Sequence, residues 1–342
     1  MIGLNPAFHY GINWKYTFEE LYENCHHPTI GISSHTALIT GGNSGIGYQT
    51  ARALAKCGVD VTLACRNESK CLVAADKIRN EAREYLKQNG DSNAINVSIM
   101  TVDMSSLKSV QQFSQEFLKK NQNGALDMLY LNAGIGVINK PGEELKLSED
   151  GIELTFATNY VGHHLMYRLL EPLLLKSKMA RVIQVSSCIS FDTFGDKVAT
   201  SLDTLNGPAR KPYSHKHYGQ SKLAQILWTK YLTKRLSEAN INNIYANASH
   251  PGSVDTGIWM KNAIVIPSFV LDYLRKYTMW TEEDGALTQL YLGVATKELM
   301  EKDIRGKYFH PQAQEVVNPL SLDEKLQKDV WDFSEELVSD FL

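Results

Sequence analysis

The sequence predicts an α/β protein with a single doubly wound parallel sheet and helices on both of its faces. Two observations carry this prediction. From residue 36 onward, short apolar runs alternate with longer amphipathic stretches, as expected for parallel strands that are joined by covering helices. No internal repeat, low-complexity tract or linker rich in proline and serine interrupts the alternation. We therefore expect a single domain over residues 36–342, preceded by an extension over residues 1–35.

Each short apolar run is a predicted strand, and each amphipathic stretch between two runs is a predicted helix. The strands are expected at Thr36–Thr40, Val59–Cys65, Asn96–Val102, Met128–Asn132, Arg181–Ser186 and Ile244–Ser249. The helices that join them are expected near residues 45–57, 68–88, 105–121, 149–175 and 215–238. The prediction is completed by a helix at Glu282–Ala295, a short strand at Gly306–Phe309 and a terminal helix at Leu322–Leu337.

Two segments depart from this alternation. In the N-terminal extension, Thr17–Glu20 has the spacing of a capping box, so we expect a short helix that docks on the main body. Residues 253–281 are rich in large apolar side chains and contain no further strand–helix unit. This second segment either completes the packed core or forms a small lobe over an apolar ligand.

The composition excludes several functional classes. The 342 residues carry a formal net charge of -3, and lysine and arginine are scattered along the chain, so no nucleic-acid partner is expected. No apolar run reaches the ~18 residues of a membrane-spanning helix, so no transmembrane segment is expected. Residues 1–35 have neither the apolar core of a secretory signal nor the composition of an organellar one. We therefore expect a cytoplasmic protein.

The cysteines and histidines predict neither disulfides nor a metal site. The five cysteines include no C-x-x-C pair, which favours free thiols in a reducing compartment. Cys25 is followed by His26 and His27, but adjacent side chains point in different directions. No second pair of ligands stands at a metal-binding spacing.

A glycine-rich turn follows the first predicted strand and runs directly into a helix. Glycines there allow a tight turn and a close approach to a pyrophosphate, while the free N–H groups at the helix start attract negative charge. The spacing is G-x-x-x-G-x-G rather than the common G-x-G-x-x-G. Its place after the first strand favours a dinucleotide site over an ordinary loop. The candidate contacts are Gly41, Asn43, Ser44, Gly45, Ile46 and Gly47.

The end of the second strand predicts which dinucleotide is bound. An acidic residue at this place would select the free 2'-hydroxyl of NAD, whereas here the strand ends in Arg66 and Asn67. A guanidinium pairs well with a 2'-phosphate, so NADP is predicted in preference to NAD. Asp60 stands at the other end of the strand and is interpreted as a turn residue. The alternative for Arg66 is an ordinary solvated arginine.

Tyr218 and Lys222 form the strongest candidate for proton transfer. On a helix, side chains four positions apart lie on the same face. The lysine would then favour the ionised form of a phenol that ordinarily titrates near ~10. Tyr218 is the only tyrosine in the chain with a lysine at this offset.

Together, these three motifs resemble the short-chain dehydrogenase/reductase family, and further matches stand in the expected order. The resemblance covers about residues 36–310 and implies a Rossmann-type fold and a nicotinamide cofactor. It adds as cofactor contacts Asp103, Asn132, Ala133, Gly134, Pro251, Gly252, Val254 and Thr256, beside Tyr218 and Lys222. It also implies that Asn159 holds a relay water and that Ser187 binds the substrate oxygen.

For some of these matches an alternative stays open. Asp103 could merely end a strand, Asn159 could cap backbone inside a helix, and Ser186 could face the site instead of Ser187. Lys222 is also expected to hold the nicotinamide ribose. A further set is expected on helix surfaces or in turns and not in catalysis: His163, His164, His215, His217 and His250.

Within the family, the sequence most resembles the branch of retinol dehydrogenases and WW domain-containing oxidoreductases, although no WW domain is expected in it. The matching segments are Cys65–Asn67, Leu131–Ile135, His250–Gly252 and Gly306–Pro311. This resemblance implies a lipophilic carbonyl or alcohol substrate, such as a retinoid, a steroid or a long-chain aldehyde. It also allows peripheral association with the endoplasmic reticulum or lipid droplets, and a homodimer through helices 149–175 and 215–238. Two alternatives are a silent NADP-binding scaffold and a reductase of carbon–carbon double bonds.

Overall fold

The protein is built on a mixed sheet of eight strands, all of them within the described residues. The computed structural model describes residues 31–90, 95–137, 144–195, 197–207, 214–254 and 280–342, together with Leu21 and Cys25, and gives only the backbone of residues 214 and 215. The strand order is β3-β2-β1-β4-β5-β6-β7-β8. The strands are β1 (Thr36–Thr40), β2 (Asp60–Cys65), β3 (Val97–Thr101), β4 (Met128–Leu131), β5 (Ala180–Val185), β6 (Ile244–Ser249), β7 (Tyr308–His310) and β8 (Gln314–Glu315).

Seven of these strands run parallel, which confirms the predicted doubly wound α/β class. The order turns back at β1, whose neighbours are β2 on one side and β4 on the other. The short strand β8 pairs antiparallel with β7 and was not foreseen. At two residues it lies below the length at which hydrophobic alternation is readable.

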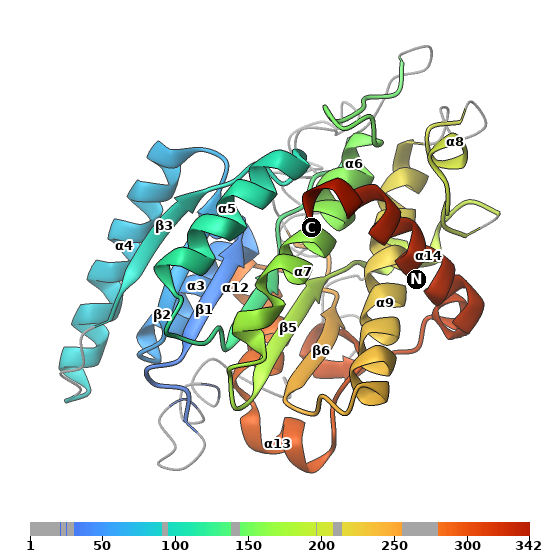
Figure 1. Cartoon of the computed structure of the whole chain (residues 1–342). Helices are drawn as coiled ribbons and strands as arrows, with labels where there is room; N and C mark the ends of the chain where they lie inside the picture. The colour runs from blue at the N-terminus through green and yellow to red at the C-terminus, as the bar shows by residue number, and fades with distance from the viewer. Residues whose placement is uncertain are drawn as a thin grey trace, which may run out of the picture.

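Helices cover both faces of the sheet (Figure 1), and each face has its own core. Alternate residues of β1 divide between the cores, with Leu38 in one and Ala37 and Ile39 in the other, as strand geometry requires. One face carries α3 (Gly45–Lys56), α4 (Glu68–Gln88), α12 (Glu282–Val294) and α13 (Thr296–Glu301). The other carries α5 (Leu107–Lys120), α7 (Gly162–Leu174), α9 (Ser214–Glu238) and α14 (Glu324–Val338).

The helix predicted near residues 149–175 starts later and is not uniform. A turn closed by Gly151, which has φ 74°, delays its start. Glu153 then caps α6 (Leu154–Phe156), which continues as the π-helix η1 (Ala157–Val161) and then as α7. The remaining long elements begin and end within two residues of their predicted bounds. Short elements that were not predicted are α8 (Leu202–Leu205), α13, and the 3-10 turns η2 (Cys188–Phe191), η3 (Pro311–Ala313), η4 (Pro319–Leu322) and η5 (Ser339–Phe341).

The prediction of free thiols is wrong for four of the five cysteines. Cys25 is bonded to Cys57 and Cys65 to Cys71, with Cα–Cα distances of 5.4 and 6.2 Å. Cys188 remains free. Cys25 and Cys57 are 32 residues apart, so only the fold brings them together, and Cys65 and Cys71, six residues apart, do not have the C-x-x-C spacing.

Some predictions fall on residues that are not described. They are the capping box at Thr17–Glu20, most of the apolar segment 253–281, Thr256 and the side chain of His215. Among the described helices, none is both long enough and apolar enough to cross a bilayer.

Candidate active site

The candidate residues gather at the edge of the sheet where the parallel strands end. Gly41 follows β1, Asn132 follows β4, Ser187 follows shortly after β5 and Pro251 follows β6. Because parallel strands place their carboxyl ends along one edge, the fold brings these four positions to the same side of the sheet. This edge, beside the point where the strand order turns back, is where α/β proteins of this type bind ligands.

The glycine-rich turn needs glycine both for its backbone conformation and for close packing. Gly41 and Gly45 have φ values of 70° and 60°, a region that glycine adopts without strain. A Cβ at Gly47 would lie 2.5 Å from Asn132 Nδ2 and 2.6 Å from the Gly41 carbonyl oxygen. Ser44 precedes α3 but its side chain accepts no N–H from that helix. The helix start is therefore shaped to receive an anion.

Thr40 ties this turn to the end of β4. Its Oγ1 accepts the N–H groups of Asn132 and Ala133, both at 2.9 Å, and its carbonyl oxygen accepts from Asn132 Nδ2 at 2.9 Å. On the other side, Thr40 Oγ1 lies 3.0 Å from His163 Nε2. The Asn132 side chain thus fixes the backbone of the glycine-rich turn.

The second strand leads to the predicted NADP contacts. The Arg66 side chain is 77% exposed, and its guanidinium lies 3.9 Å from Asp103 Oδ2, a contact that contributes little at the surface. The Asn67 side chain caps α4 by accepting the Lys70 N–H at 2.9 Å. Asp103 accepts from the N–H of Ser105 at 2.9 Å. Asp103 therefore braces the turn that follows β3, while the Arg66 side chain stays exposed.

Tyr218, Lys222 and Ser187 come together at the start of α9. Lys222 Nζ lies 5.3 Å from the centroid of the Tyr218 ring and donates to the Val185 carbonyl oxygen at 2.7 Å. The Ser187 side chain is hydrogen-bonded to Tyr218. Ser186 Oγ instead donates to the Lys222 carbonyl oxygen at 2.7 Å. The geometry therefore favours Ser187 over Ser186 as the serine that faces the site.

Burial shifts the two titratable groups in opposite ways. It raises the pKa of Tyr218 to about 12, while the hydrogen bond from Ser187 acts in the lowering direction. It lowers the pKa of Lys222 to about 7. Burial is thus the largest cause of both pKa shifts.

Asn159 lies inside the π-helix and locks two segments together. Its Oδ1 accepts the Ile135 N–H at 2.8 Å, and its Nδ2 donates to the Ile135 carbonyl oxygen at 3.0 Å and to Ser221 Oγ at 3.1 Å. Its carbonyl oxygen accepts from His163 Nδ1 at 2.9 Å and from Gln225 Nε2 at 2.8 Å. Sequence reasoning missed Gln225, although it stands three residues after Lys222 on the same helix.

The loop after β6 reaches back toward the glycine-rich turn. Gly252 has φ 90°, and a Cβ there would lie 2.7 Å from Trp280 Cδ1. Val254 forms a β-bridge with Trp280. A Cβ at Gly285 would lie 2.6 Å from Val254 Cγ2 and 3.4 Å from Ile46 Cγ1, so Val254 lies close to Ile46. The structure thus places two of the predicted cofactor contacts side by side.

The histidines are more deeply placed than expected. His163 and His164 are fully buried and His217 nearly so, which corrects their prediction as helix-surface residues, while His250 is buried in the loop after β6. The helix α7, which carries His163 and His164, packs against α5 and the sheet, and His164 also meets Trp331 of α14. A helix covered on several sides has no wide solvent-exposed face.

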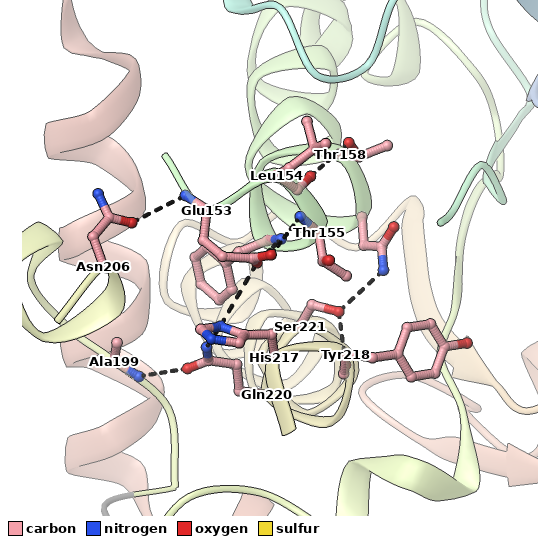
Figure 2. A network of polar contacts seen from close by, with 12 residues as sticks. Glu153, Leu154, Thr155, Thr158, Ala199, Asn206, His217, Tyr218, Gln220 and Ser221 are labelled. Carbon is pink, nitrogen blue, oxygen red and sulfur yellow. Dashed lines mark hydrogen bonds and ion pairs between the residues drawn. The ribbon is translucent and has the colours of Figure 1, made fainter. Parts of the chain in front are cut away.

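A polar network near Tyr218 was also missed by the sequence prediction. Figure 2 shows Glu153, Asn206, His217 and Gln220 joined beside the start of α9. The sequence did not predict this network, because a buried glutamate such as Glu153 cannot be distinguished from an exposed one before the surrounding helices are placed.

Comparisons with known proteins agree with this geometry. Residues 35–199 match the model of the short chain dehydrogenase family. Human retinol dehydrogenase 14 is 34% identical over 89% of this chain and 86% of its own length. The WW domain-containing oxidoreductase of Gallus gallus is 33% identical over 91% of this chain and 70% of its own length. The chain belongs to the short-chain dehydrogenase/reductase family.

A solved structure supports the fold of this family member. L-sorbose reductase from Gluconobacter frateurii, complexed with NADPH and L-sorbose, superposes with a TM-score of 0.61 at 19% identity, covering 84% of this chain and 99% of that one. As a member of the short-chain dehydrogenase/reductase family, the protein is an oxidoreductase with a nicotinamide cofactor. Its residues fit that cofactor, because Gly41 and Gly45 give the tight turn after β1, and the Ser44 side chain leaves the N–H groups at the start of α3 uncapped for a pyrophosphate.

Proposed function

We propose that the protein uses NADP(H) to interconvert a carbonyl group and an alcohol on a lipophilic substrate, with Tyr218 as the general acid and base. The observation that carries this proposal is the meeting of Tyr218, Ser187 and Lys222 at the same sheet edge as the glycine-rich turn. The cofactor supplies or accepts the hydride. The protein then has to bind the substrate oxygen and move one proton.

The side chains divide this work between them. In the reducing direction, Ser187 donates a hydrogen bond to the substrate oxygen, where negative charge develops. Tyr218 gives its phenolic proton to the same oxygen, and its pKa of about 12 keeps that proton available at neutral pH. Lys222 holds the nicotinamide ribose, and we propose that protonation of Lys222 stabilises the phenolate that forms. Asn159 holds the segment after β4 against α9.

The preference for NADP and the class of substrate are parts of the same proposal. Arg66 is exposed at the end of β2 and faces no strong carboxylate partner, since Asp103 is 3.9 Å away. Support for a lipophilic substrate comes from the names of the relatives and from the apolar composition of residues 253–281. Because such molecules concentrate in membranes and lipid droplets, we also propose that the protein meets them at a membrane or droplet surface.

A screen of NADPH consumption tests the proposal. We expect turnover of retinal, ketosteroids or long-chain aldehydes, with the alcohol as product. Tyr218→Phe should abolish this turnover, because it removes the transferred proton and keeps the ring, while NADPH affinity stays close to that of the wild type. Unchanged turnover in Tyr218→Phe would reject the catalytic assignment. A product reduced at a carbon–carbon bond would identify a different reaction of the same family.

A further inference from the structure

The Glu153 side chain is a buried carboxyl group near the active site. Its residue is only 2% exposed, and burial raises its pKa to about 7. Its two carboxyl oxygens accept the N–H groups of Thr155 at 3.0 Å and Phe156 at 2.7 Å, so it caps α6. Ser, Thr or Asp caps a helix equally well, and a buried carboxyl group carries a desolvation cost. Helix capping alone therefore does not account for a glutamate here.

A second buried residue faces this carboxyl group from α9. His217 is 1% exposed, and its Nδ1 lies 3.9 Å from Glu153 Oε2. The same Nδ1 lies 3.1 Å from Gln220 Nε2, and Gln220 Oε1 accepts the Ala199 N–H at 3.3 Å. The network also includes Asn206, whose Oδ1 accepts the Glu153 N–H at 3.1 Å. It thus joins α6, α9 and the segment 199–206 (Figure 2).

Both ends of this network lead to residues of the candidate active site. His217 directly precedes Tyr218, and Ser221, one helical turn further, donates to the Tyr218 carbonyl oxygen at 2.8 Å. The helix that Glu153 caps continues into the π-helix that contains Asn159. Asn159 Nδ2 in turn donates to Ser221 Oγ at 3.1 Å. The helix of Asn159 and the first two turns of α9 are therefore joined at two places, one of which is the contact between Glu153 and His217.

We propose that Glu153 and His217 are positioning residues that hold the first turn of α9, and with it Tyr218, against the helix of Asn159. The proposal rests on the proposed function of Tyr218. Neither residue contacts the substrate or the cofactor in this role. Their effect is on the place of the Tyr218 hydroxyl, and a displacement of about 1 Å in a reacting group costs on the order of 100-fold in rate.

The test combines kinetics with a measurement that needs no turnover. We expect Glu153→Gln and His217→Ala each to lower kcat by about tenfold or more through misplacement of Tyr218, while KM and the dissociation constant for NADPH change little. His217→Asn, which keeps an acceptor near the place of Nδ1, should recover part of the loss. The matched control is Glu149→Gln, the same change at an exposed glutamate four residues earlier, and it should behave as the wild type.

A double variant separates positioning from general destabilisation. If Glu153 and His217 act as a unit, Glu153→Gln combined with His217→Asn should lose no more kcat than the more damaging single change. Strictly additive losses in kcat would overturn the proposal. Equal losses in kcat and in NADPH binding would also overturn it, because they would show a smaller folded fraction and not a displaced tyrosine.

Hydrogen exchange on the full chain keeps this test distinct from that of the proposed function. Amides of residues 216–222 should exchange faster in Glu153→Gln than in Glu149→Gln, while those of β1 and α3 should not change. Unchanged exchange at residues 216–222 would reject the positioning role even if activity fell. Faster exchange in a protein that turns over no carbonyl substrate would instead keep the structural link and reject the proposed function.

Discussion

Tyr218 and Lys222 have pKa values displaced in opposite directions by the same cause, the removal of water from their charged forms. With a pKa of about 12, the phenol of Tyr218 is protonated at neutral pH and ready to act as an acid. Under the proposed mechanism, the same group acts as a base in alcohol oxidation, which requires the phenolate. The residue that transfers the proton therefore makes the two directions of the reaction respond differently to pH.

We predict that the rate of alcohol oxidation rises with pH between about 7 and 10, while carbonyl reduction does not rise over this range. The sign follows from Tyr218, because a higher pH increases the small fraction of phenolate below its pKa. Initial rates of NADP⁺ reduction and NADPH oxidation, measured under saturating conditions at each pH, check this prediction. Oxidation that falls with rising pH while the protein stays folded would contradict the role of Tyr218 as a base.

The proposed cofactor preference rests on a second single residue, Arg66. We expect Arg66→Asp to weaken NADPH binding far more than NADH binding, because a carboxylate replaces the group that pairs with the 2'-phosphate. Fluorescence titration with both cofactors measures the effect. Arg83→Asp is a matched control, since Arg83 is an exposed arginine on α4. Equal losses for both cofactors would show that Arg66 does not distinguish them.

Single residues also show which parts of the site could be predicted from the sequence alone. Tyr218, Lys222 and the glycine-rich turn were identified as candidates because spacing along one element places them together. The contact of Arg66 with Asp103 and the burial of His163 depend on chain segments that are distant in sequence. Local patterns carry no information about such neighbours.

At the scale of elements, the helix around Asn159 shows the same limit. Its apolar periodicity predicted one helix over residues 149–175, and the structure instead starts it at Leu154 and contains a π-helix at Ala157–Val161. A π-helix inserts an extra residue into a helical turn and is frequent at functional sites. The amphipathic pattern persists across it, so hydrophobic periodicity does not reveal it. The start was misplaced because Gly151 closes a turn in a stretch that otherwise looks helical.

At the scale of the whole molecule, α14 covers the face that the family resemblance assigned to a homodimer. It packs along α9, and Figure 1 shows it beside that helix. Trp331 is 3% exposed and stacks on Trp228, with ring centroids 6.1 Å apart. Glu335 Oε1 lies 2.8 Å from His164 Nε2 on α7. Through these contacts α14 occupies the surface of α7 and α9 on which a partner subunit would otherwise pack.

We therefore predict that the full chain forms no dimer through α7 and α9. Sedimentation equilibrium at micromolar concentration should give the mass of one chain, and a dimer crosslinked through α9 would contradict this prediction.

Trp331→Ala tests whether α14 is held as described. Loss of a buried indole lowers the free energy of unfolding by about 3–5 kcal/mol. The midpoint of thermal unfolding of Trp331→Ala should therefore fall well below that of the control Val317→Ala, in which the replaced residue is 52% exposed. If Trp331→Ala stays as stable as the control, α14 does not pack against α9 in solution, and this face is free for a partner.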